Sequence, residues 1–139
     1  MTSQPDIDQR YAAAEQVFFA GDHDAARAHL DAVLQAQPGH AGALHLRGLV
    51  ALEAKEPGGA AHWIEQALRA RPDPIFYNSL SVVQIRSGAL AEGAASAQRG
   101  LDLARSEPSV SIDTSILAFN LGVALQLNDD MEAAEHAYR

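Results

Sequence analysis

Histidine and carboxylate side chains are the residues of this sequence that could do chemistry, as metal ligands or proton carriers. The 139 residues include six histidines and no cysteine, which excludes disulfides and thiolate ligands. The densest cluster is Asp22-His23-Asp24, whose oxygen and nitrogen atoms could bind a metal. Because this triplet falls where a turn meets an expected helix start, Asp24 is better explained as a capping or dipole-compensating residue. We therefore expect no metal site.

The other histidines and the motif content also argue against catalysis. His29, His62 and His136 stand at similar places in different segments, so they are expected to lie apart instead of converging on one metal. The sequence has no GxxxxGK[ST], no GxGxxG after a strand, no HExxH and no GxSxG. We expect no enzyme activity and no cofactor in this segment.

Composition limits the classes of partner. The net charge is -8, from 18 acidic and 10 basic residues, and the basic residues are scattered singly. A basic stripe that would follow a nucleic-acid backbone is missing, and anionic membranes are disfavoured for the same reason. No apolar stretch approaches the roughly 20 residues of a membrane span. The start, MTSQPDIDQRYAAAEQ, has neither the basic nor the apolar region of a secretory signal. These features predict a soluble, cytoplasmic protein.

The elements that must position any site are helices, and they repeat. AGDHDAARAHLDAVLQAQPGH (20–40) aligns with AKEPGGAAHWIEQALRARPDP (54–74), so that Ala26 and Ala60, like Pro38 and Pro72, are 34 positions apart. SGALAEGAASAQRGLDLARSE is a third copy and NDDMEAAEHAYR a partial fourth. Each copy follows a helical segment that ends at a turn residue: Gly21, Lys55, Gly88 or Asp129. Each unit therefore reads as a helical hairpin.

Small residues recur where the two helices of each hairpin should cross. Backbones can approach closely only where side chains are small, and proline ends a hairpin because it lacks an N–H and clashes with the preceding turn. The eighth position of each unit is small (Ala14, Gly48, Ser81, Gly122), as is the twentieth (Ala26, Ala60, Gly93, Ala134), while Leu30, Ile64 and Tyr138 are larger residues expected to fill the space below the crossing.

This period and small–large pattern resembles the tetratricopeptide repeat (TPR) family, most closely in FNLGVALQLNDDMEAAEHAY. The sequence departs from the family pattern at the fourth position, where Arg10, Leu44, Tyr77 and Ala118 replace tryptophan, and at EPGGA, where the second helix begins. The resemblance implies an all-α, right-handed TPR superhelix of three full helical hairpins and a truncated fourth. We expect a single domain over 1–139, with repeats at about 7–40, 41–73, 74–107 and 115–139.

An insertion of about seven residues relative to the period lies between Arg105 and Ser115. We interpret 106–114 as an inserted surface loop, or as an extended helix end followed by an N-cap at Asp113 or Thr114. The alternative is a contact loop for a partner.

The family resemblance also implies a concave groove lined by the first helix of each repeat. Its second, fifth, ninth and twelfth positions carry over to Asp8, Gly42, Ile75, Ile116 and Gln126, and to the candidate groove residues Tyr11, Glu15, Phe18, His45, Leu49, Leu52, Asn78, Val82, Ile85, Phe119 and Val123, with Asn120 one position away. This set contains no lysine, which argues against a clamp for a carboxylate. We expect an amphipathic helix or an extended apolar peptide, with Asn78 and Asn120 bonding its backbone.

The expected function is therefore a protein–protein interaction module that binds a peptide or partner helix. One alternative is the N-terminal, substrate-recruiting region of a larger bacterial enzyme, of the glycosyltransferase or sulfotransferase type. Another is a self-associating scaffold, because an uncapped last repeat would expose apolar surface and form homodimers. The abrupt end in the fourth repeat favours a fragment. Some candidate groove residues could simply pack between helices, and Phe19 or Trp63 could pack between repeats. For Trp63 we expect core or inter-repeat packing, with an interaction anchor on the outer face as the alternative.

Overall fold

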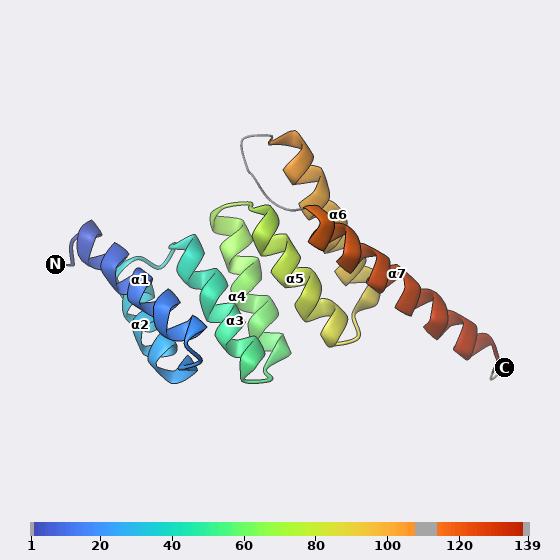
Figure 1. The fold of residues 1–139 in the computed structure, drawn as a ribbon, viewed down its shortest axis with the longest axis horizontal. Helices are drawn as coiled ribbons and strands as arrows, with labels where there is room; N and C mark the ends of the chain where they lie inside the picture. Colours follow the sequence, from blue (N-terminus) through green and yellow to red (C-terminus); the bar gives the residue numbers. More distant parts are fainter. Residues whose placement is uncertain (1, 108–113, 138–139) are drawn as a thin grey trace. The chain divides into compact units, whose positions relative to one another are not determined.

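The described part of the chain is entirely helical. We used a computed structural model that describes residues 2–107 and 114–137, and these residues form seven helices and no strand (Figure 1). They divide between two compact units, Met1–Pro72 and Asp73–Arg139. The first unit holds α1 (Gln4–Phe19), α2 (His23–Ala36), α3 (Ala41–Glu53) and α4 (Pro57–Ala70); the second holds α5 (Pro74–Arg86), α6 (Leu90–Ser106) and α7 (Thr114–Ala137). The all-α expectation is confirmed.

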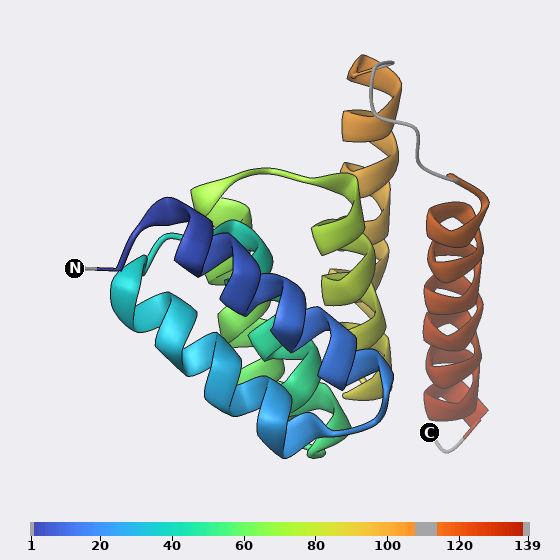
Figure 2. The same cartoon turned by 60° about the vertical axis from the view of Figure 1, so that its left-hand side comes forward.

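Three of the four expected turns are present and share one geometry. Gly21, Lys55 and Gly88 have φ values of 92°, 61° and 84°, in the left-handed region that ends helices. In each turn the next residue donates its N–H to the carbonyl five positions earlier, for example Asp22 to Val17 at 2.9 Å. These turns reverse the chain between α1 and α2 (Figure 2), α3 and α4, and α5 and α6. How the helices divide into sequence repeats stays a prediction.

Short polar residues fix where several helices begin. The Asp22 carboxylate accepts the N–H of Ala25 at 3.0 Å and so caps α2, while Asp24 lies in the first turn. The imidazole Nδ1 of His40 accepts the N–H of Ala43 in the same way. Asp22 is therefore the capping residue of the Asp22-His23-Asp24 triplet, and Asp24 is placed to compensate the helix dipole.

Close approach of α3 to α4 depends on a glycine. A Cβ atom placed on Gly48 would lie 2.6 Å from Cγ1 of Ile64 and 3.1 Å from the carbonyl oxygen of Ala60. In the second unit Ser81 occupies the equivalent place on α5, and its hydroxyl donates to the Gly93 carbonyl of α6 at 2.8 Å. The small residues expected at the hairpin crossings are thus found at these two crossings.

Arg47 links three helices of the first unit. Its Nε lies 3.2 Å from the Asp31 carboxylate of α2, and its guanidinium lies 5.1 Å from the ring centroid of Trp63 on α4. The Arg47 side chain is only 15% exposed, which shields the contact with the ring from water. Trp63 is half-buried, and its expected packing in the core or between repeats stays a prediction.

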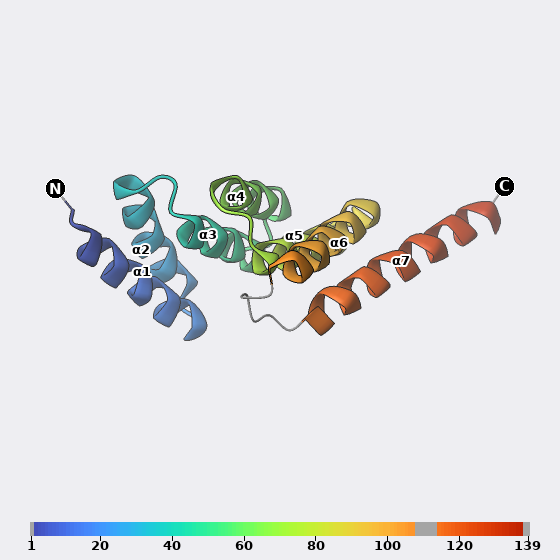
Figure 3. The same cartoon turned by 90° about the horizontal axis from the view of Figure 1, so that it is seen from above.

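The fourth hairpin is not seen. We expected a turn at Asp129, but α7 runs without a break from Thr114 to Ala137, as the view from above shows (Figure 3). Side-chain hydrogen bonds cross the expected turn, from Gln126 to Asp130 at 3.0 Å and from Asn128 to Glu132 at 3.4 Å. No glycine stands there to adopt a positive φ at low cost. The inserted loop and the possible cap at Asp113 lie mostly outside the described residues.

Candidate partner-binding site

In the first unit the candidate residues lie on α1 and α3. We call Tyr11, Glu15, Phe18, His45, Leu49 and Leu52 the α1–α3 face. All six side chains are half-buried. Tyr11, Phe18 and Leu49 pack against the core of the unit, which includes Leu30, Leu46 and Val50. Three side chains of this face are therefore partly exposed and also packed against the core.

Tyr11 connects the two helices of this face. A Cβ atom on Gly42, at the start of α3, would lie 2.6 Å from the Tyr11 hydroxyl oxygen, so the ring needs a glycine there. Its ring centroid is 4.7 Å from that of His40. Burial raises the pKa of the Tyr11 phenol; the Glu15 carboxylate raises it further and Arg71 lowers it. The phenol is therefore held neutral, as a hydrogen-bonding group beside a carboxylate.

Phe18 and its neighbour extend the apolar surface at the end of α1. The Phe18 ring lies 5.1 Å from the ring of His23 and makes an edge contact with Phe19 at 5.3 Å. Phe19 is 77% exposed. Sequence reasoning missed Phe19 as a surface residue, although its position beside the turn at Gly21 indicates exposure.

In the second unit two candidate residues bind each other. Nδ2 of Asn120 on α7 donates a hydrogen bond to Oδ1 of Asn78 on α5 at 2.5 Å, and Asn120 is 9% exposed. This bond links α5 and α7, and it occupies one of the two N–H donors of the Asn120 side chain. Contact of either residue with a peptide stays a prediction.

The remaining candidate residues of the second unit differ in exposure. Val82 and Ile85 of α5 and Val123 of α7 are half-buried. Ile85 lies against α6, since its Cγ1 would be 2.9 Å from a Cβ atom on Gly93. Phe119 is 69% exposed, and Ile75 and Ile116 are about half exposed (49% and 53%). Ile85 therefore has a packing role, whereas Phe119 is open to solvent.

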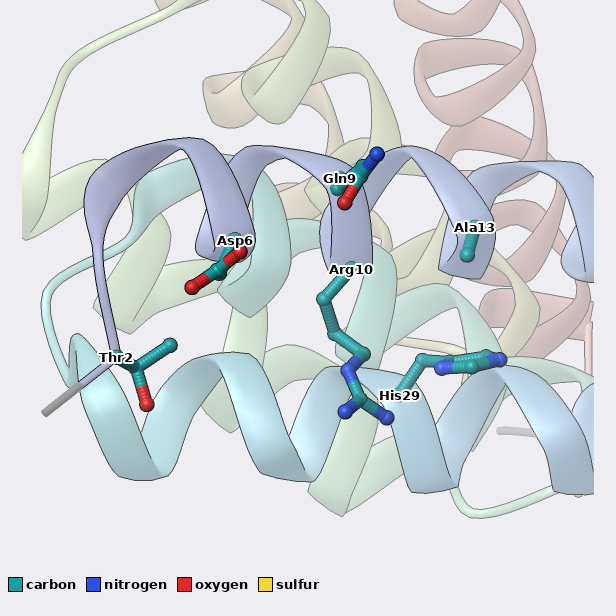
Figure 4. A pocket seen from close by; sticks show the side chains of 6 residues that line it. All are labelled: Thr2, Asp6, Gln9, Arg10, Ala13 and His29. Atoms are coloured by element: carbon teal, nitrogen blue, oxygen red, sulfur yellow. The ribbon is translucent and has the colours of Figure 1, made fainter.

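A hollow lies on a different side of α1 from the α1–α3 face. Its volume is about 650 Å³, and its lining residues on α1 are spaced as one helical face. Arg10 extends from α1 toward α2, beside His29 (Figure 4). Its guanidinium suits a carboxylate or another anion. Sequence reasoning did not single out this site, which is lined by Thr2, Asp6, Gln9, Arg10, Ala13 and His29.

The described residues hold neither a candidate metal site nor a candidate membrane-spanning helix. Within residues 2–107 and 114–137, no group of three or more histidine or acidic side chains could hold a metal ion. None of the helices described is both long enough and apolar enough to cross a membrane.

Comparisons with known proteins agree on the fold. The tetratricopeptide repeat family model matches residues 20–83. A comparison with curated proteins found no match to this sequence. Among solved structures, an O-GlcNAc transferase mutant of Thermobaculum terrenum is 28% identical, with a TM-score of 0.78 over 90% of this chain. The alignment takes in only 23% of that protein, so this chain spans about a quarter of its length.

Two more distant structures share the fold over most of both chains. The type III secretion translocator chaperone SycD of Yersinia enterocolitica is 15% identical, with a TM-score of 0.83, covering 93% of this chain and 90% of SycD. The first TPR of Spaghetti (RPAP3), bound to the HSP90 peptide SRMEEVD, is 16% identical, with a TM-score of 0.79, covering 92% and 97%. Together with the family-model match to residues 20–83, these likenesses identify the chain as a protein of tetratricopeptide repeat fold.

Proposed function

We propose that this chain is a protein-interaction module that holds a peptide or a partner helix against the α1–α3 face. One observation carries the proposal: Tyr11, Phe18 and Leu49 pack on the core yet keep part of their surface exposed. Side chains fixed in this way lose little conformational freedom when a partner binds, so the entropic penalty of association is small. The module has no catalytic role of its own.

The chemistry of the face indicates the kind of partner. Phe18, Leu49 and Leu52 offer apolar contacts, while Tyr11 and Glu15 offer a neutral phenol and a carboxylate. The net charge of -8 favours partners with basic residues. An amphipathic helix with apolar positions three or four residues apart and a flanking lysine or arginine fits these groups.

The second unit carries candidate binding residues of its own. Val82 and Val123 are half-buried and Phe119 is exposed, so they can contact the apolar side chains of a bound segment. Asn78 keeps further donor and acceptor capacity beyond its bond to Asn120, because an amide carries two N–H groups and two lone pairs. It can therefore still bond a peptide backbone.

Site-specific photocrosslinking tests the proposal. A photoreactive residue at Leu49 or Leu52 is expected to capture the same partner from lysate of the native organism. The matched control carries it at Ala28, which is exposed on α2. Equal capture from Ala28 would show that the partner does not bind at the α1–α3 face. Synthetic peptides from the captured protein would locate the segment that binds.

A second candidate function follows from the O-GlcNAc transferase match. At 28% identity over 90% of this chain, it favours a recruiting region that presents substrates to a catalytic domain of the same protein. Reading the gene beyond Arg139 tests this candidate. A glycosyltransferase-type domain there supports it, and a stop codon soon after Arg139 contradicts it.

A further inference from the structure

One face of α7 lacks the covering that the same face has on α3. We call Ala118, Gly122 and Leu125 the α7 hairpin face. These residues stand at the same interval from Leu44, Gly48 and Ala51 of α3, each of which is buried. On α7 all three are exposed, and Leu125 is 50% exposed. The face is therefore apolar and open.

Gly48 of α3 and Gly122 of α7 differ in what surrounds them. A Cβ atom on Gly48 would meet Ile64 and the Ala60 carbonyl of α4, whereas one on Gly122 would meet nothing within 4 Å. A glycine in a helix interior destabilises the helix by about 1 kcal/mol relative to alanine. At Gly48 the close helix contact explains the glycine, but in the straight α7 nothing offsets this penalty at Gly122.

The C-terminal half of α7 carries the signals of a helix start. Asp130 follows Asp22 by 108 positions, the same interval as Ala134 from Ala26, so it corresponds to the residue that caps α2, and Asp129 corresponds to Gly21 in the turn. In the straight helix Asp129, Asp130 and Glu132 lie inside the helix instead of at its start.

We propose that α7 has a second state, in which it breaks at 128–130 and residues 131–137 fold back to cover the α7 hairpin face. The occupant of this face is thus a segment of the same chain. Ala134 is as far from Ala60 as Gly122 is from Gly48, so the fold-back brings a small residue to the open glycine. The carboxylates of Asp130 and Glu132 then lie at a helix N-terminus, where they are favourable.

The two states differ in the surface that they offer. The straight helix exposes Leu125 and Gly122, and the fold-back hides them, so a partner that contacts this face binds the straight state. The folded-back segment and such a partner compete for the same face, so the fold-back lowers the apparent affinity of the partner. This inference does not depend on binding at the α1–α3 face.

Spin labels measure the equilibrium without a partner. The chain has no cysteine, so Thr114→Cys with Glu135→Cys gives one labelled pair. The two positions are 135 − 114 = 21 residues apart, about 31 Å along a straight helix at 1.5 Å per residue. Folding back shortens this distance to roughly 20 Å or less. A control pair, Thr114→Cys with Gln126→Cys, lies before the break and is expected to give one unchanged distance.

Two variants shift the equilibrium in opposite directions. Asp129→Gly permits a positive φ, as at Gly21 and Gly88, and is expected to raise the ratio of short to long distances on the order of fivefold. Asp130→Ala removes the cap and is expected to lower that ratio. A single distance in all three proteins, long or short, would overturn the proposal, as would a mixture that neither variant changes.

Discussion

The side-chain amide of Asn120 on α7 donates a hydrogen bond to the side-chain carbonyl of Asn78 on α5. Both residues were predicted from sequence to hold the backbone of a partner, and within the second unit they hold each other. Asn120 is 9% exposed, so the bond lies largely away from water. It ties the helix with the open apolar face to the rest of its unit.

A double-mutant cycle at this pair tests its structural role. Asn120→Ala leaves the Asn78 carbonyl without that donor and should lower the free energy of unfolding by about 1–3 kcal/mol. The double variant with Asn78→Ala should show a coupling energy of about 1 kcal/mol. Urea unfolding followed by circular dichroism gives both values. Additive effects would mean that the bond contributes nothing to stability.

Two glycine substitutions form a matched pair. Gly48→Ala adds a methyl group 2.6 Å from Ile64 and should lower stability, because overpacking costs about 1–3 kcal/mol and exceeds the gain of about 1 kcal/mol in helix propensity. Gly122→Ala meets nothing within 4 Å and should raise the stability of the straight α7 by up to ~1 kcal/mol. Thermal unfolding of the two variants should give shifts of opposite sign. Equal shifts would contradict the packing described at Gly48.

Tyr11 predicts a pH dependence at alkaline pH. Burial and Glu15 raise the pKa of its phenol above 10.0, so the folded state favours the neutral form. The resulting stabilisation is fully present below the pKa of the unfolded state and is lost as pH rises through that of the folded state. Relative to Tyr11→Phe, the wild-type protein should lose stability as the pH rises above about 10, through the raised pKa of the Tyr11 phenol. A constant difference in melting temperature across this range would contradict the assignment.

The exposed apolar side chains of α7 predict self-association. Phe119, Leu127 and Met131 are 69%, 41% and 60% exposed, and burying them against a second copy is favourable. Light scattering over a wide dilution series should detect concentration-dependent dimers, which Phe119→Ser with Leu127→Ser should weaken. Monomers at every concentration of the wild-type protein would exclude this contact.

The hairpins could be predicted because their signals are local. Gly21, Lys55 and Gly88 end helices at recurring positions, and the structure gives each a positive φ. Small residues at the crossings, such as Gly48 and Ser81, follow the same period. Each of these signals acts over a few residues or one repeat, which is the range that a sequence pattern records well.

Contacts that depend on side-chain direction could not be predicted. The sequence places Asn78 and Asn120 at similar positions, but their mutual bond depends on how α5 meets α7. The contact of Tyr11 with Gly42 likewise depends on the approach of α1 to α3. The straight α7 overrides a turn signal at Asp129, because a continuous helix satisfies its backbone without a positive φ.

Binding of an identified partner peptide to a charged variant tests the central claim most directly. Leu49→Glu with Val82→Glu adds carboxylates to both units, and Ala28→Glu with Ala91→Glu adds the same charge at exposed positions of the second helices. Titration calorimetry should show at least a ~100-fold loss of affinity for the first variant and little change for the second, with circular dichroism showing equal helix content. A peptide that binds both variants and the wild-type protein equally would contradict the account.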